Sequence, residues 1–228
     1  MRHSVTGQIL PARCNSHLCP ACSPLHQMAA RLAIERGIVG SFSRSRTERV
    51  IFLTLTDTAE GEMDLPGFRK RWDKTRRRLQ TMWGAGEYAL SVEFQKRGAL
   101  HPHVCIEVDD QVADDLVDHG SEASYYRRMK QLRPAMMELG WGQMVDAETV
   151  KVLAAEKVAR YGAKAVAGYA TKEAAGKFKR AGARYVRPVR LSYGWYPRGL
   201  KGAREELMGQ MDGKIEGSWE RIPKPRTC

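Results

Sequence analysis

The sequence lacks several features that would each indicate a familiar class of protein. Its 228 residues contain no apolar run long enough to span a bilayer, no internal repeat and no low-complexity tract. The phosphate-binding loop G-x-x-x-x-G-K-[ST] and the dinucleotide fingerprint G-x-G-x-x-G are both missing, so we expect no membrane partner and no nucleotide cofactor. The first ten residues carry no apolar core of the kind found in signal peptides, which predicts a cytoplasmic protein.

Cysteine is scarce, and its distribution is uneven. Three of the five cysteines, Cys14, Cys19 and Cys22, fall within nine residues, and the other two are isolated. A C-x2-C pair presents two thiolates to one tetrahedral ion, and a reducing compartment disfavours disulfides. The alternative is free thiols in a mobile arm. We predict a small N-terminal arm with a structural Zn²⁺, whose fourth ligand is His26 or His17.

Acidic residues are outnumbered by basic ones. The 38 Lys and Arg against 26 Asp and Glu leave a net charge of +12, which is typical of a polyanion binder. Cations crowd residues 69–78, where a solvated helix face is an equally good interpretation, and residues 177–204, where they alternate with aromatic residues that suit base stacking in single strands. The predicted DNA-binding residues are Arg69, Lys70, Arg71, Arg76, Arg77, Arg78, Arg184, Arg187 and Arg190.

Two histidines occupy alternate positions of a predicted strand. His101 and His103 share a face because successive strand residues point to opposite sides. A turn at 96–99 would fold this strand onto the preceding one and bring Glu93 opposite or near His103. Two imidazoles and a carboxylate accept Mg²⁺ or Mn²⁺ with coordination positions left open. The alternative is a pair of ordinary, half-buried strand histidines.

A later helical segment carries two tyrosines, each followed by a lysine at the third position. These pairs are Tyr161 with Lys164, and Tyr169 with Lys172. An ammonium near a phenol lowers the cost of ionising it, and so activates a nucleophile whose ordinary pKa is about 10. Eight residues correspond to about 80° of helical rotation, so the tyrosines do not share a face. The sequence favours Tyr169, with Tyr161 as the alternative, against a structural role packing on the sheet.

The order of these pieces resembles the HUH endonucleases, specifically rolling-circle replication initiators of bacterial plasmids, phages and actinobacterial integrative elements. The resemblance rests on residues 93–103, which contain His101 and His103, followed by residues 166–172, which contain Tyr169. Cysteines near residue 14, the apolar stretch 52–56 and the basic stretch 184–192 fit in the same order, so that about residues 13–195 are covered. Relaxases resemble the family in reverse order, with the tyrosine first.

The resemblance implies a reaction. A tyrosine attacks a metal-bound phosphate in single-stranded or hairpin origin DNA, which leaves a 5′-phosphotyrosine and a free 3′-hydroxyl primer. No nucleotide is consumed, so a host helicase or supercoiling must separate the strands. Two alternatives remain: a single-strand transposase of the same class, and a non-enzymatic, zinc-containing DNA-binding regulator.

Periodicity predicts one α+β domain, an HUH endonuclease fold with an antiparallel sheet covered by helices. We expect the zinc-binding arm and a helix in residues 1–45, the endonuclease domain in 46–200 and a basic tail in 201–228. The expected elements are helices at 24–39, 65–82, 109–119, 121–139 and 154–179, strands at 49–56, 88–95 and 100–108, and one more strand at 142–145 or 149–153.

Overall fold

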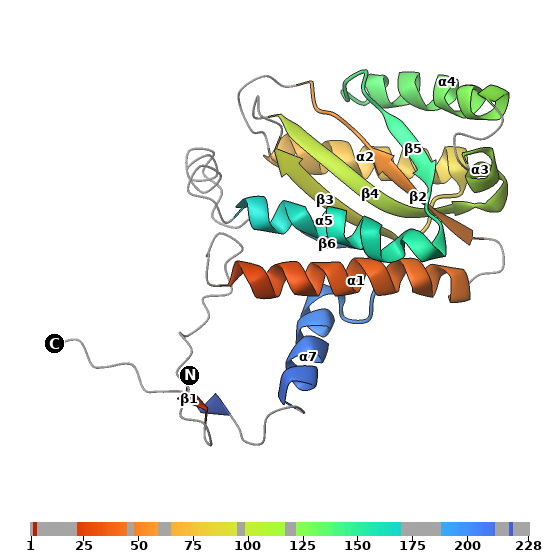
Figure 1. The fold of residues 1–228 in the computed structure, drawn as a ribbon. Helices are drawn as coiled ribbons and strands as arrows, with labels where there is room; N and C mark the ends of the chain where they lie inside the picture. The colour runs from red at the N-terminus through yellow and green to blue at the C-terminus, as the bar shows by residue number, and fades with distance from the viewer. Residues whose placement is uncertain are drawn as a thin grey trace.

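The computed structural model describes residues 2–3, 22–44, 48–58, 65–94, 99–116, 122–169, 188–212 and 219–220. Within these segments the chain forms one five-stranded antiparallel sheet with helices on both of its faces (Figure 1). A separate two-stranded pair joins residues near the two ends of the chain. The predicted α+β class, with an antiparallel sheet covered by helices, is confirmed.

The sheet has the strand order β5-β2-β4-β3-β6. The predicted hairpin is present as β3 and β4, and the fifth predicted strand falls between the two stretches that the sequence suggested for it. The short strand β6, which follows a basic tract, was not predicted. The strands are β1 (Arg2–His3), β2 (Glu48–Thr54), β3 (Tyr88–Phe94), β4 (Leu100–Asp109), β5 (Asp146–Thr149), β6 (Val189–Leu191) and β7 (Trp219–Glu220).

The predicted helices are all present, with shifted ends. A helix not foreseen, α7, occupies the start of the stretch expected to be a tail, so that the boundary at residue 201 falls inside a helix. None of the described helices is long and apolar enough to cross a membrane. The helices are α1 (Ser23–Arg44), α2 (Leu65–Trp83), α3 (Asp110–Asp115), α4 (Glu122–Glu138), α5 (Ala155–Tyr169) and α7 (Gly199–Asp212), with a 3-10 turn at Val152–Ala154.

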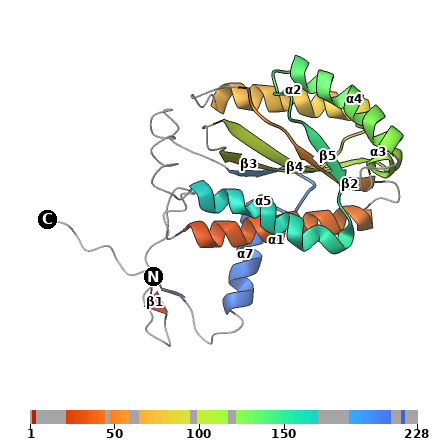
Figure 2. The same cartoon turned by 45° about the horizontal axis from the view of Figure 1, so that its top comes forward.

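Alternation along the strands divides the core into two layers. Odd residues of β2 such as Ile51 and even residues of β4 such as Ile106 pack against α2, α3 and α4. The opposite residues, among them Cys105, pack against α1, α5 and α7. Figure 2 shows α2 and α4 on one side of the sheet, and α1 and α5 on the other. We call the side covered by α1 and α5 the site face, because His101 and His103 share it with Cys105.

Small residues let α5 lie close to both α1 and the sheet. Ala159 and Ala163 are buried, as are Ala29 and Ala33 on α1. A Cβ atom added at Gly162 would lie 3.1 Å from the Cδ1 of Ile34 and 3.5 Å from the Oγ of Ser91. The residue before this glycine is therefore held just above the strands of the site face.

Candidate active site

The histidine pair lies on the site face, where strands β2, β3 and β4 run side by side. In the strand register Glu93 is opposite His101, and His103 is flanked by Ser91 on β3 and Thr54 on β2. The Oε2 of Glu93 lies 3.8 Å from the Nε2 of His103. The two imidazole rings have centroids 4.5 Å apart and stand nearly perpendicular. The hairpin therefore brings the three predicted ligands together, as their spacing suggested.

Two threonines of the neighbouring strand segment hold the imidazoles from behind. The Oγ1 of Thr54 lies 3.2 Å from the Nδ1 of His103, and the Oγ1 of Thr56 lies 3.4 Å from the Nδ1 of His101. With the proton on Nδ1, each ring donates to a threonine oxygen and keeps the Nε2 lone pair. Metal-binding histidines are commonly oriented by such a bond from their other nitrogen.

Tyr161 completes the cluster from helix α5. Its hydroxyl oxygen lies 3.4 Å from the Nε2 of His103, and the two rings meet edge to face with centroids 4.9 Å apart. Phe52 stacks on the other side of this arrangement, parallel to His103 at 5.4 Å and edge-on to Tyr161 at 5.9 Å. His103 is 2% exposed, whereas Tyr161 is 44% exposed. The phenol is therefore accessible to a large substrate, and the imidazole beneath it is not.

The electrostatic environment sets the charge of each group. Burial lowers the pKa of His101, and the neighbouring His103 lowers it further against the opposing charge of Glu93. The interaction with His103 lowers the pKa of Glu93, although burial opposes it, and the charge of Lys164 helps. Burial and then the charge of Glu93 raise the pKa of Tyr161. Near neutral pH the site therefore holds a neutral His101, a carboxylate and a protonated phenol.

These donors suit Mg²⁺ or Mn²⁺ in kind. A neutral imidazole with its Nε2 free and an ionised carboxylate are the forms in which these side chains bind metal. Among the described residues, no three His, Cys, Asp or Glu side chains already surround a single point. The side chains of Glu93, His101 and His103 would therefore need small rotations to share one ion.

The two candidate tyrosines differ in what the structure shows of them. Tyr161 reaches the histidine pair, and Lys164, one turn further on, is close enough for its charge to act on Glu93. Tyr169 is the last residue of α5, and its side chain is outside the described part of the chain, as is all of Lys172. The geometry thus favours Tyr161 for a reason that the sequence did not contain.

The predicted zinc ligands are described only in part. Cys22 and His26 are both buried, and the backbone N–H of His26 donates to the carbonyl of Cys22 over 3.2 Å. This helical bond puts the two side chains on one side of the first turn of α1. Cys14, Cys19 and His17 lie outside the described residues. The zinc site therefore stays a prediction.

The predicted DNA-binding cations do not form one surface. The α2 residues Arg69, Lys70, Arg76, Arg77 and Arg78 lie on the opposite side of the sheet from the histidine pair, and of these only Arg76 is not exposed. Arg71 differs from its neighbours, because its guanidinium is 2.6 Å from Asp57 and lies over the Trp141 ring. Its side chain is only 16% exposed, so we assign it a structural role. Arg190 is half-buried in β6, and Arg184 and Arg187 lie outside the described residues.

Sequence reasoning missed the residues that surround the histidines from other elements. Thr54, Thr56 and Phe52 belong to an apolar stretch whose alternation predicts a strand but not which strand it will lie beside. Lys157 precedes Tyr161 by one helical turn and lies beside the same cavity. The i, i+4 spacing of Lys157 and Tyr161 was the available signal.

The fold and site define a class: an α+β protein whose antiparallel sheet carries paired histidines beneath an accessible tyrosine. The family model of the replication-associated protein ORF2 matches residues 50–174, more than half of the chain. The chain belongs to this family and is therefore a replication-associated protein. The resemblance to replication initiators is thereby confirmed, and with it an interaction with DNA. No significant match was found among curated proteins or among solved structures.

Proposed function

We propose that this protein is an HUH endonuclease that initiates rolling-circle replication by nicking single-stranded origin DNA. The observation that carries the proposal is the position of the Tyr161 hydroxyl, 3.4 Å from the Nε2 of His103 and accessible to solvent. A nucleophile beside a metal-binding pair, on a protein of a replication-associated family, fits covalent strand cleavage.

In this mechanism the Tyr161 oxygen attacks the scissile phosphorus. A new bond from phosphorus to the tyrosine oxygen forms, the bond to the 3′ oxygen breaks, and that oxygen takes up a proton as the phenol loses one. Glu93, His101 and His103 would hold Mg²⁺ or Mn²⁺, which when bound supplies positive charge that polarises the phosphate and stabilises the phenolate. Lys164 adds a further positive charge near the reacting groups. Tyr169 with Lys172 remains the alternative nucleophile and helper.

Transesterification of this kind consumes no nucleotide, because the phosphodiester that is broken is replaced by another. The free 3′-hydroxyl primes synthesis, and a host helicase separates the strands. We also propose that Cys14, Cys19 and Cys22, with His26 or His17, bind a structural Zn²⁺. Elemental analysis of protein purified without chelator should then find about one zinc per chain, and finding none would refute the zinc site.

The test of this function is a covalent adduct. The protein is incubated with Mn²⁺ and a pool of single-stranded oligonucleotides, and DNA that stays attached through denaturation is sequenced. We expect an adduct that EDTA and the His103→Ala change both prevent, while noncovalent DNA binding persists, because the basic surfaces supply most of the affinity. An adduct formed equally by His103→Ala in EDTA would contradict the metal-assisted mechanism.

A further inference from the structure

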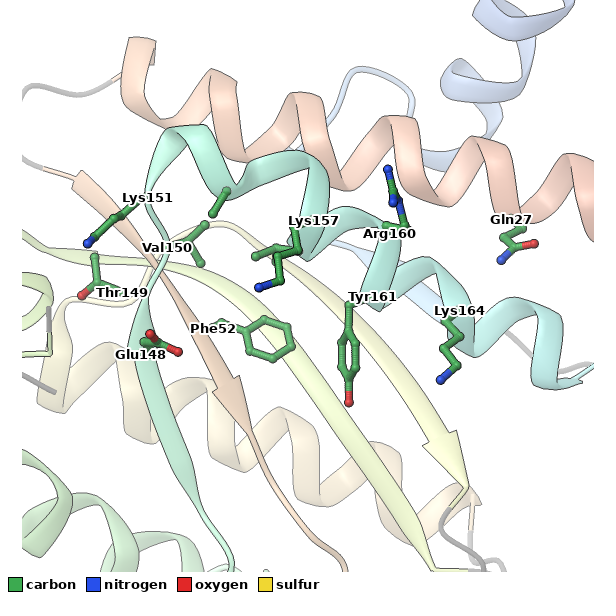
Figure 3. A pocket seen from close by; sticks show the side chains of 12 residues that line it. Gln27, Phe52, Glu148, Thr149, Val150, Lys151, Lys157, Arg160, Tyr161 and Lys164 are labelled. Carbon is green, nitrogen blue, oxygen red and sulfur yellow. The ribbon is translucent and has the colours of Figure 1, made fainter. Parts of the chain in front are cut away.

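A cavity of about 610 Å³ opens directly beside Tyr161, between helix α5 and the strands β2 and β5. Figure 3 shows the side chains of Phe52, Lys157, Tyr161 and Lys164 together along it. Its volume is within the range of about 300–1,000 Å³ that is typical of small-molecule sites. The proposed chemistry uses only the edge of this cavity at Tyr161 and leaves the remainder without a role.

One wall of the cavity is aromatic. Phe52 is half-buried, and His103 stacks on one of its faces at 5.4 Å with an interplanar angle of 9°. The part of the ring that borders the cavity is therefore the side away from His103. A base placed there would extend the stack that begins with His103. Stacking of a base on an aromatic side chain contributes about 1–3 kcal/mol in single-strand binding proteins; Val150 and Val158 make the adjacent wall apolar.

The helix side of the cavity is cationic. Lys157, Tyr161 and Lys164 follow one another at spacings of four and three residues, so they lie along one helical face. Neither lysine forms an ion pair with a carboxylate of the described residues. Arg160, by contrast, points toward α1 and is 2.7 Å from Glu156 (Figure 3). The two lysines are thus available for a phosphate, one on each side of the tyrosine.

The strand side carries one acceptor. Glu148 on β5 lies directly opposite Phe52 in the strand register and borders the cavity. Directly opposed residues of neighbouring antiparallel strands have Cβ atoms about 4.5–5.5 Å apart, so the carboxylate lies at the edge of the ring. An ionised carboxylate only accepts hydrogen bonds, and cytosine and adenine offer an exocyclic amino group where thymine offers a carbonyl oxygen.

We propose that this cavity binds one nucleotide of the DNA strand next to the scissile phosphate, and that it selects a base with an exocyclic amino group. The base lies against Phe52, its amino group donates to Glu148, and a backbone phosphate lies at Lys157. This inference rests on the proposed function, because it takes single-stranded DNA as the ligand. It adds a specificity-determining residue, Glu148, that takes no part in the cleavage step.

The test is equilibrium binding without cleavage. Fluorescence anisotropy in EDTA at fixed salt compares labelled single strands of twelve deoxycytidines, deoxyadenosines or thymidines. We expect the cytosine and adenine strands to bind about fivefold more tightly than the thymine strand. Glu148→Ala should abolish this preference, and Lys157→Ala should weaken all three strands alike. Lys130→Ala, which changes an exposed lysine of α4 on the other side of the sheet, should leave all three affinities unchanged.

Equal affinity of the unaltered protein for the three strands would overturn the inference, and so would a preference that survives Glu148→Ala. A Lys157→Ala protein that binds like Lys130→Ala would remove the phosphate contact. The outcome is separable from that of the proposed function. A base preference that depends on Glu148, in a protein that never forms a covalent adduct, supports the cavity and refutes the nuclease; an adduct without the preference does the reverse.

Discussion

The hydroxyl groups of Thr54 and Thr56 set which nitrogen of each histidine faces the substrate. Both contact an Nδ1 atom, at 3.2 and 3.4 Å, and so direct the two Nε2 atoms toward Glu93 and Tyr161. A methyl group in place of the hydroxyl keeps the volume and β-branching of the side chain but removes this bond. The ring could then rotate or take the other tautomer.

We therefore predict that Thr54→Val lowers the affinity for Mn²⁺ by about 10-fold or more, because outer contacts of metal ligands typically have effects of 10–100-fold. Thr54→Ser keeps the hydroxyl and should bind Mn²⁺ nearly as well as the unaltered protein. Isothermal titration of each protein with MnCl₂ measures this directly. Equal affinities for the valine and serine variants would mean that the threonine does not orient His103.

At this scale the sequence predicted only what local spacing determines. His101 and His103 share a face because strands have a period of two, and Glu93 lies near them because a hairpin has only a few registers. The threonines and Phe52 come from β2, about fifty residues earlier, and no local pattern specifies that β2 pairs with β4. The choice between the tyrosines depends on where α5 crosses the sheet, which is a tertiary property.

Helix α2 shows that one run of charge can serve two roles. Its basic residues face solvent except for Arg71, which bonds to Asp57 and to the carbonyl of Gly140 at 2.6 and 2.8 Å. Asp57 is itself buried, in the segment that follows β2. The sequence could not separate Arg71 from its neighbours, because only its position beside Trp141 in space distinguishes it.

Arg71→Met should therefore destabilise the protein by about 3 kcal/mol, because it leaves Asp57 buried without its cation. Arg77→Met, on the exposed side of the same helix, should change stability by less than about 0.5 kcal/mol. Urea unfolding followed by tryptophan fluorescence gives both free energies. Similar values for the two variants would show that the Arg71 ion pair has no special structural role.

The junction of α3 and α4 contains a second buried carboxylate. Burial raises the pKa of Asp115, but the hydrogen bond from Arg128 and the charges of Arg128 and Arg127 outweigh it and hold the pKa below its ordinary value. Arg128 donates to the carboxylate from 2.7 Å. A carboxyl group whose pKa is lowered by folding contributes stability above its unfolded pKa of about 3.9, and this contribution is lost as pH falls through the folded pKa.

Asp115→Asn should consequently cost about 2 kcal/mol of stability at pH 7. The difference from the unaltered protein should shrink as the pH falls below about 4, where the aspartate becomes protonated as well. Urea unfolding at a series of pH values measures the difference. A difference that stays constant down to pH 3 would rule out the charge of Asp115 as its cause.

At the scale of the molecule, the sheet separates the proposed chemistry from much of the positive charge. The histidines, Tyr161 and the cavity lie on the site face, and the exposed cations of α2 lie on the opposite side (Figure 2). The net charge of +12 predicted a polyanion as partner but could not show this division. Likewise, α1 packs on the site face rather than belonging to a separate arm, and α7 begins where a tail was expected.

Replacing Arg76, Arg77 and Arg78 together by Ala should weaken DNA binding for every sequence and flatten the dependence of log K on log salt by up to about 0.7 per lost phosphate contact, the value for single strands. Cleavage at saturating DNA should keep its rate, because these residues are remote from Tyr161. Binding titrations at several salt concentrations and single-turnover cleavage assays measure the two effects. An unchanged salt slope would mean that α2 does not bind DNA.

The central claim, that Tyr161 attacks DNA beside the histidine pair, is tested most directly by mapping the covalent adduct. Trypsin cuts after Arg160, Lys164 and Lys172, so it places the two candidate tyrosines in separate peptides, residues 161–164 and 165–172. Mass spectrometry of the nuclease-trimmed, trypsin-digested adduct should find the nucleotide mass on peptide 161–164. The nucleotide on peptide 165–172, or no adduct with any single strand in Mn²⁺, would contradict the claim.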